Sequence, residues 1–75
     1  MTKFRMRQPR GLDGRHWAEQ NAQRIQSFVL PAKAIMGHSR NDWSVEFEAD
    51  TESITDCNIV IKEIMRYAGF LEAIK

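Results

Sequence analysis

Residues 42–50, "DWSVEFEAD", carry the clearest structural pattern in the chain. Their apolar members occupy every second position, and polar residues fill the positions between them. A period of two is typical of a β-strand that buries one face and leaves the other open. We therefore predict a strand whose core side carries Trp43, Val45, Phe47 and Ala49 and whose outer side carries Ser44, Glu46 and Glu48.

A helix is predicted directly after this strand, over residues 51–69, "TESITDCNIVIKEIMRYAG". Thr51 or Ser53 can cap its first turn, and Gly69 is a natural C-terminal stop. Cys57 lies on the apolar side, where a buried and unreactive thiol is the usual state. Steps of three and four place one apolar seam along this helix, widened by Val60 and Met65: Ile54, Cys57, Ile61, Ile64, Ala68 and Leu71.

The N-terminal part repeats this order of strand and helix. Residues 2–8, "TKFRMRQ", alternate, with Phe4 and Met6 on one face and basic residues on the other. Residues 9–14, "PRGLDG", have turn composition, and Asp13 or Gly14 can start a helix that runs to about residue 28, before Pro31. The apolar stripe predicted for this helix is Trp17, Ala18, Ala22, Ile25 and Phe28.

Two segments are ambiguous. Residues 32–42, "AKAIMGHSRND", fit either a short strand that enters a hairpin turn or a short helix that ends at Gly37. Residues 70–75, "FLEAIK", fit either a last helical turn or a short strand. We predict one α/β (α+β) domain over residues 1–75, a small two-layer sandwich of a mostly antiparallel sheet with two main helices on one face.

Composition narrows the function classes. A chain of 75 residues with one cysteine has no disulfide framework and no cysteine zinc site, which favours a cytoplasmic location. No apolar run is long enough to span a bilayer, so we expect no membrane partner. The two histidines, His16 and His38, lack metal-ligand spacing, and no nucleophile–base pair stands out. We expect no metal, no cofactor and no enzymatic activity.

Charge is unevenly distributed along the chain. Residues 1–16 carry a net charge of +4, and residues 42–56 carry −6. If the two predicted strands are neighbours, Lys3, Arg5 and Arg7 lie opposite Glu46 and Glu48, and such cross-strand pairs contribute about 0.2–1 kcal/mol each. The alternative is that the basic segment binds nucleic acid through the same three residues.

Three stretches together resemble the HPr family, the phosphocarriers of the sugar phosphotransferase system. The resemblance covers "GLDGRHWA" (11–18), "AKAIMGH" (32–38) and "VEFEADTESITDCNIVIKEI" (45–64). It implies an open-faced sandwich with the first strand beside the last, and a short helix at "AKAIMGH". The matching residues are Gly11, Leu12, Arg15 and Ala18 at the corner, Lys33, Ile35, Met36 and Gly37 in the short helix, Val45, Phe47 and Ala49 in the strand, and Cys57, Ile61 and Met65 in the closing helix.

The sequence departs from this family at its functional positions. Asp13 stands where the family has its phosphorylated histidine, His16 where it has a proline, and Ala34 where it has a regulatory serine. The resemblance therefore does not imply phosphoryl transfer through the usual histidine. The same pattern of elements also allows a ferredoxin-like βαββαβ plait, with residues 32–36 as its second strand and 70–74 as its fourth. In topology we therefore predict either an HPr-like open-faced sandwich or a ferredoxin-like plait.

We expect a non-catalytic interaction or regulatory module that binds a protein partner or itself. The residues predicted to carry binding are Arg10, Arg15, His16 and Trp17, because arginine and tryptophan are enriched at binding hot spots. A short chain with a small core also favours a homodimer that buries a free sheet edge or the last helix.

Two alternatives stay open. The first is a phosphocarrier-like or phosphate-sensing protein that holds an anion between Asp13 and His16, with the helix N-terminus and Arg15 as donors. The second is nucleic-acid binding through Lys3, Arg5 and Arg7.

Overall fold

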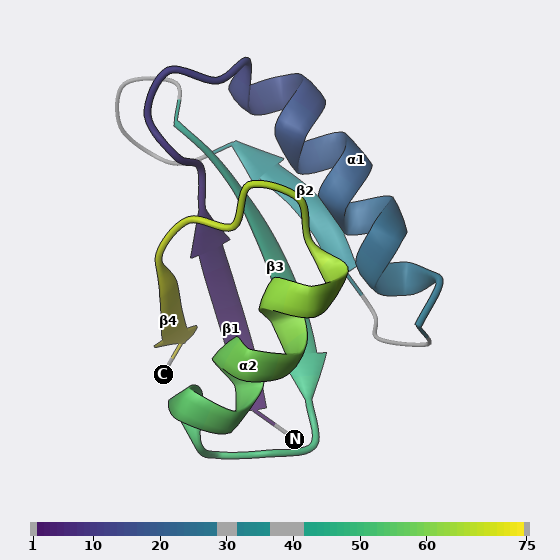
Figure 1. Ribbon diagram of the computed structural model, residues 1–75, viewed down its shortest axis with the longest axis vertical. Coiled ribbons are helices and arrows are strands. Elements are labelled where there is room, and N and C mark those ends of the chain that lie inside the picture. Colours follow the sequence, from purple (N-terminus) through teal and green to yellow (C-terminus); the bar gives the residue numbers. More distant parts are fainter. Residues whose placement is uncertain (1, 29–31, 37–41, 75) are drawn as a thin grey trace.

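The protein folds into one four-stranded sheet with two helices packed on it (Figure 1), in a computed structural model that describes residues 2–28, 32–36 and 42–74. The strands pair antiparallel in the order β2-β3-β1-β4. This confirms the predicted fold class. The elements are β1 (Thr2–Arg7), α1 (Gly14–Gln26), β2 (Ala32–Met36), β3 (Trp43–Ala49), α2 (Ile54–Ile64) and β4 (Leu71–Ile74).

This order of strands is that of the ferredoxin-like plait, in which each helix joins two strands that have a third between them. Residues 32–36 form a strand and not the short helix that the phosphocarrier resemblance implies. Their alternate residues match β3, with Ala34 opposite Val45 and Lys33 opposite Glu46. Gly37, His38 and Pro31, which the sequence analysis singled out, lie outside the described residues.

The core lies between the sheet and the helices, on the face that alternation predicts. Phe4 and Phe47 are opposite one another in register, and their rings stack with centroids 5.9 Å apart. We call the other side of the sheet the open face, because no described helix covers it (Figure 1). The sheet residues buried on the core side are Phe4, Met6, Ala32, Val45, Phe47 and Ala49.

Helix α1 begins as predicted, with Asp13 as its N-cap. The Asp13 side chain accepts the backbone N–H of His16 at 3.3 Å. Trp17, Ala18, Ala22 and Ile25 are buried, which confirms most of the predicted stripe. Phe28 is an exception, because α1 ends at Gln26 and the Phe28 side chain, beyond that end, is 61% exposed.

Helix α2 also begins as predicted but ends five residues early. Ser53 caps it by accepting the backbone N–H of Asp56 at 3.3 Å, and the helix ends at Ile64, not at Gly69. Its buried side is narrower than the predicted seam, since Ile54 and Val60 flank that side and are exposed. The residues that do enter the core from this segment are Cys57, Ile61, Ile64 and Met65.

Side chains of α1 bind the backbone where α2 ends. Trp17 Nε1 donates to the Tyr67 carbonyl oxygen at 2.9 Å, and Arg24 Nε donates to that of Ile64 at 2.7 Å. Between them, buried Asn21 donates to the Arg66 carbonyl oxygen at 3.1 Å and accepts the Arg66 N–H at 2.8 Å. The end of a helix leaves carbonyl groups without intrahelical partners, and α1 supplies partners here. This explains why the helix ends at Ile64.

Gly69 has a different function from the predicted helix stop. A β-carbon at this position would collide with the backbone carbonyl oxygen of Arg7. The chain passes close to the end of β1 here, and the Arg7 N–H donates to the Phe70 carbonyl oxygen at 2.9 Å. Gly69 therefore allows β4 to join β1.

Candidate functional site

The open face carries a row of alternating charge across all four strands. Lys33 of β2 is opposite Glu46 of β3, Glu46 is opposite Arg5 of β1, and Arg5 is opposite Glu72 of β4. The row is therefore positive, negative, positive, negative from one edge of the sheet to the other. A second, shorter row places Lys3 opposite Glu48.

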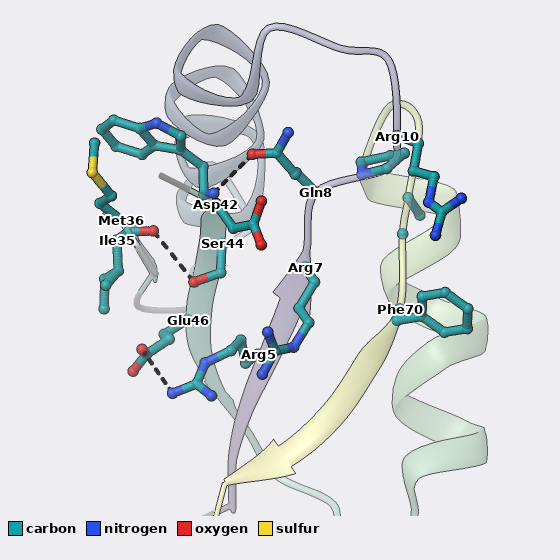
Figure 2. A pocket seen from close by; sticks show the side chains of 14 residues that line it. Arg5, Arg7, Gln8, Arg10, Ile35, Met36, Asp42, Ser44, Glu46 and Phe70 are labelled. Carbon is teal, nitrogen blue, oxygen red and sulfur yellow. Dashed lines mark hydrogen bonds and ion pairs between the residues drawn. The ribbon is translucent and has the colours of Figure 1, made fainter. Parts of the chain in front are cut away.

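Ion pairs join these charges within the molecule. Arg5 lies 3.5 Å from Glu46 and 3.3 Å from Glu72, and Arg7 lies 3.0 Å from Glu72, measured from nitrogen to oxygen. Figure 2 shows Arg5 reaching across to Glu46. The prediction that the basic and acidic strands are neighbours is thus confirmed. Arg7 differs in detail, because its register partner is Ser44 and its carboxylate partner comes from β4.

A groove of about 820 Å³ opens on this face, where β1 ends and β3 begins (Figure 2). Its lining is both basic and apolar. Arg7 and Arg10 contribute guanidinium groups. Ile35, in β2, and Phe70, directly before β4, contribute apolar surface at opposite sides of the groove. Phe70 is 83% exposed, which is unusual for a side chain of this size.

Hydrogen bonds hold the residues beneath the groove in place. The Gln8 side-chain oxygen accepts the Trp43 N–H at 2.8 Å, and the Gln8 N–H donates to the Trp43 carbonyl oxygen at 3.0 Å. Ser44 Oγ donates to the Ile35 carbonyl oxygen at 3.3 Å (Figure 2). These bonds tie β1, β3 and β2 together, so the groove has a preformed floor.

The four residues predicted to carry binding do not form one site. Arg10 lines the groove and is exposed. Arg15 and His16 are exposed at the start of α1, where Arg15 Nε donates to Glu19 at 3.1 Å. Trp17 is 4% exposed and points into the core, so its indole is a structural group in this fold.

Asp13 and Cys57, the other residues considered for a chemical role, have positions that the fold itself explains. Asp13 caps α1, which accounts for a carboxylate at that corner. Cys57 is buried, and burial raises the pKa of its thiol to about 11, which disfavours the thiolate. Within residues 2–28, 32–36 and 42–74, no three histidine, cysteine or carboxylate side chains cluster to hold a metal ion. The helices in this part of the chain are too short or too polar to cross a membrane.

Sequence reasoning missed the groove because its apolar groups come from the two ambiguous segments. Ile35 lies in β2, and Phe70 directly precedes β4. Lys33 and Glu72 were the available signal, because a strand places Ile35 on the same side as Lys33 and Phe70 on the same side as Glu72. The register was still needed to bring them into one row with Ser44 and Arg7.

Comparisons with models of protein families, with curated proteins and with solved structures found no significant match to this chain.

Proposed function

We propose that this protein is a small non-catalytic interaction module that binds protein through the open face of its sheet. The observation that carries the proposal is the groove, which exposed Arg10 and Phe70 both line, on a face that no described helix covers. Arginine and aromatic side chains, phenylalanine among them, are enriched at the cores of protein interfaces. Of the four residues predicted to carry binding, Arg10 lies in this groove. Arg15, His16 and Trp17, at the start of α1, lie outside it.

The charge of this face favours protein over nucleic acid as the partner. A polyphosphate backbone binds through several unpaired basic side chains and is repelled by carboxylates. Here Arg5 and Arg7 are paired with glutamates, and Glu48 is adjacent to Lys3. A face with both signs of charge can be matched by a protein surface of complementary charge.

The absence of catalysis is part of the proposal. The groove is lined by arginines, Asp42, Glu46, apolar groups, and Gln8 and Ser44, whose side chains are hydrogen-bonded to the backbone. His16 lies at the start of α1 and Cys57 lies in the core. Neither of these two side chains can act on a molecule held in the groove.

A pair of matched double variants tests the open face. Arg10→Glu with Phe70→Asp alters the groove, and Arg15→Glu with Phe28→Asp makes the same changes at exposed positions on α1 and beyond its end. We expect native cell extract to yield a bound protein, or sedimentation to show self-association, with the wild type and the control but not with the groove variant.

Circular dichroism establishes that both double variants are folded before binding is compared. Retention of every wild-type interaction by a folded groove variant would show that the open face is not the binding surface.

A further inference from the structure

We infer that the occupant of the open face is a second copy of this chain. The two copies are related by a two-fold axis that runs parallel to the strands and lies over the line between β1 and β3. The inference rests on the proposed function, since it names the partner of the same face. It follows from a property of the described rows of the open face: their charged residues, and the apolar ends of the row at the groove, are complementary to the same rows read in the opposite direction.

The geometry of such a dimer is simple. Two sheets that pack face to face keep their strands roughly aligned, about 30° apart. A two-fold axis along the strands turns the order β2-β3-β1-β4 around, so β2 lies over the partner's β4 and β3 lies over the partner's β1. Positions along the strands are unchanged by this rotation, so every row meets itself reversed.

The charged rows become complementary in this arrangement. Lys33 lies over the partner's Glu72, and Glu46 lies over the partner's Arg5, with both contacts repeated by symmetry. In the next row, Glu48 lies over the partner's Lys3. Opposite charges therefore meet at each of these contacts, and electrostatic complementarity of this kind selects the orientation of two partners.

The row at the groove is complementary in polarity. It runs from Ile35 through Ser44 and Arg7 to Phe70, which joins Arg7 through the backbone. Reversal places Ile35 against the partner's Phe70, which gives an apolar contact at each end of the row, while Ser44 is 4% exposed and lies beneath the surface that the partner meets. The contact covers the 83% exposed Phe70 ring, which has no cover within the described chain.

Other orientations lose this match. An axis across the strands would bring Lys33 near the partner's Lys33 and Glu72 near the partner's Glu72, and like charges in contact disfavour association.

The size of the open face also fits a dimer interface, because the molecule measures 30 × 25 × 17 Å and the sheet lies across its broad side (Figure 1). A standard interface uses about 800 Å² of surface per partner.

Charge exchange between two chains tests the arrangement. Lys33→Glu alone and Glu72→Lys alone each place like charges at both symmetric contacts. We expect the dissociation constant, measured by sedimentation equilibrium, to rise about tenfold or more in each, since reversal of two partly exposed pairs amounts to roughly 1.4 kcal/mol. An equimolar mixture of the two variants restores opposite charges at both contacts, so we expect a heterodimer of near wild-type affinity.

The mixture separates interface effects from folding effects. Each variant also introduces repulsion within its own chain, next to Glu46 or next to Arg5 and Arg7, and that repulsion persists in the mixture. Only a contact between chains can therefore be rescued. Phe70→Asp, which alters none of the ion pairs, provides an independent check against Phe28→Asp and should weaken the dimer while its control does not.

Two results would overturn the inference: a wild type that stays monomeric at several hundred micromolar, about the range in which weak dimers are detected, or a mixture that associates no better than the single variants. The proposed function would survive either result if the groove double variant still lost a different protein partner. It would fail separately if that variant lost nothing.

Discussion

Cys57 illustrates how a single residue is defined by its position on a helix. Period 3.6 placed it on the apolar side of the predicted helix, and the structure buries it with 3% exposed. Burial disfavours the charged thiolate and raises the thiol pKa from 9.0 to about 11. Asp13 is defined in the same local way, by its place as a helix cap, whereas Gly69 is defined by a tertiary approach to the carbonyl group of Arg7.

The raised pKa of Cys57 predicts a loss of stability in alkali. Below pH 9 the thiol keeps its proton in both states, so its contribution is constant. As pH rises from 9 through 11, the unfolded chain loses that proton first, and the free energy of unfolding falls. Urea unfolding from about pH 8 to about pH 11 should show a steeper decline for the wild type than for Cys57→Ala. Parallel declines would contradict this prediction.

At the scale of elements, the end of α2 depends on α1. Trp17, Asn21 and Arg24 lie on one side of α1, and all three donate hydrogen bonds to carbonyl oxygens between residues 64 and 67. These contacts join residues 40 to 50 positions apart in the chain. The chain after Ile64 consequently leaves the helix, and Tyr67 adopts a left-handed backbone with φ 55°.

Asn21→Ala should therefore destabilise the fold more than the replacement of a polar side chain by alanine usually does. It removes both side-chain partners of the Arg66 backbone and leaves those part-buried groups without these hydrogen bonds, at a cost of about 2 kcal/mol in the free energy of unfolding. Gln20→Ala, at the exposed neighbouring position, should change that free energy by less than about 0.5 kcal/mol. Chemical denaturation measures both, and equal effects would show that the Asn21 bonds contribute nothing.

At the scale of the whole molecule, the two oppositely charged segments lie side by side in the sheet. The positive residues of β1 are opposite or bonded to the carboxylates of β3 and β4. The uneven charge of the sequence therefore becomes a nearly balanced open face. Such a face offers few unpaired basic groups to nucleic acid.

This balance predicts the effect of removing the basic residues of β1. Replacing Lys3, Arg5 and Arg7 with glutamine should lower the free energy of unfolding by roughly 1–2 kcal/mol, the sum expected for partly exposed cross-strand pairs. Replacing Arg15, Lys62 and Arg66 removes the same charge on the helix side and serves as the control. Binding to single- and double-stranded DNA should be weak and equal for the wild type and both variants. Salt-dependent DNA binding that only the β1 variant loses would support the nucleic-acid alternative instead.

The candidate site was only partly predictable. Arg10 could be selected as an exposed arginine in a turn, but Trp17 satisfied two patterns at once, an apolar stripe and a binding hot spot. The structure assigns it to the core because its indole N–H has a partner in Tyr67, which no local pattern contains. Phe70 and Ile35 were missed because their segments were too short to separate helix from strand by period alone.

The faces of β1 and β3, the capped starts of both helices and the burial of Cys57 follow from the amino-acid sequence alone. These properties are local, because side-chain direction follows from the period of the backbone and a cap needs only the first turn. Tertiary structure alone decided the order β2-β3-β1-β4, the strand at residues 32–36, the end of α2, and the union of Ile35, Arg7 and Phe70 in one row. Each of these depends on hydrogen bonds or packing between distant residues, and such partners become neighbours only when the chain folds.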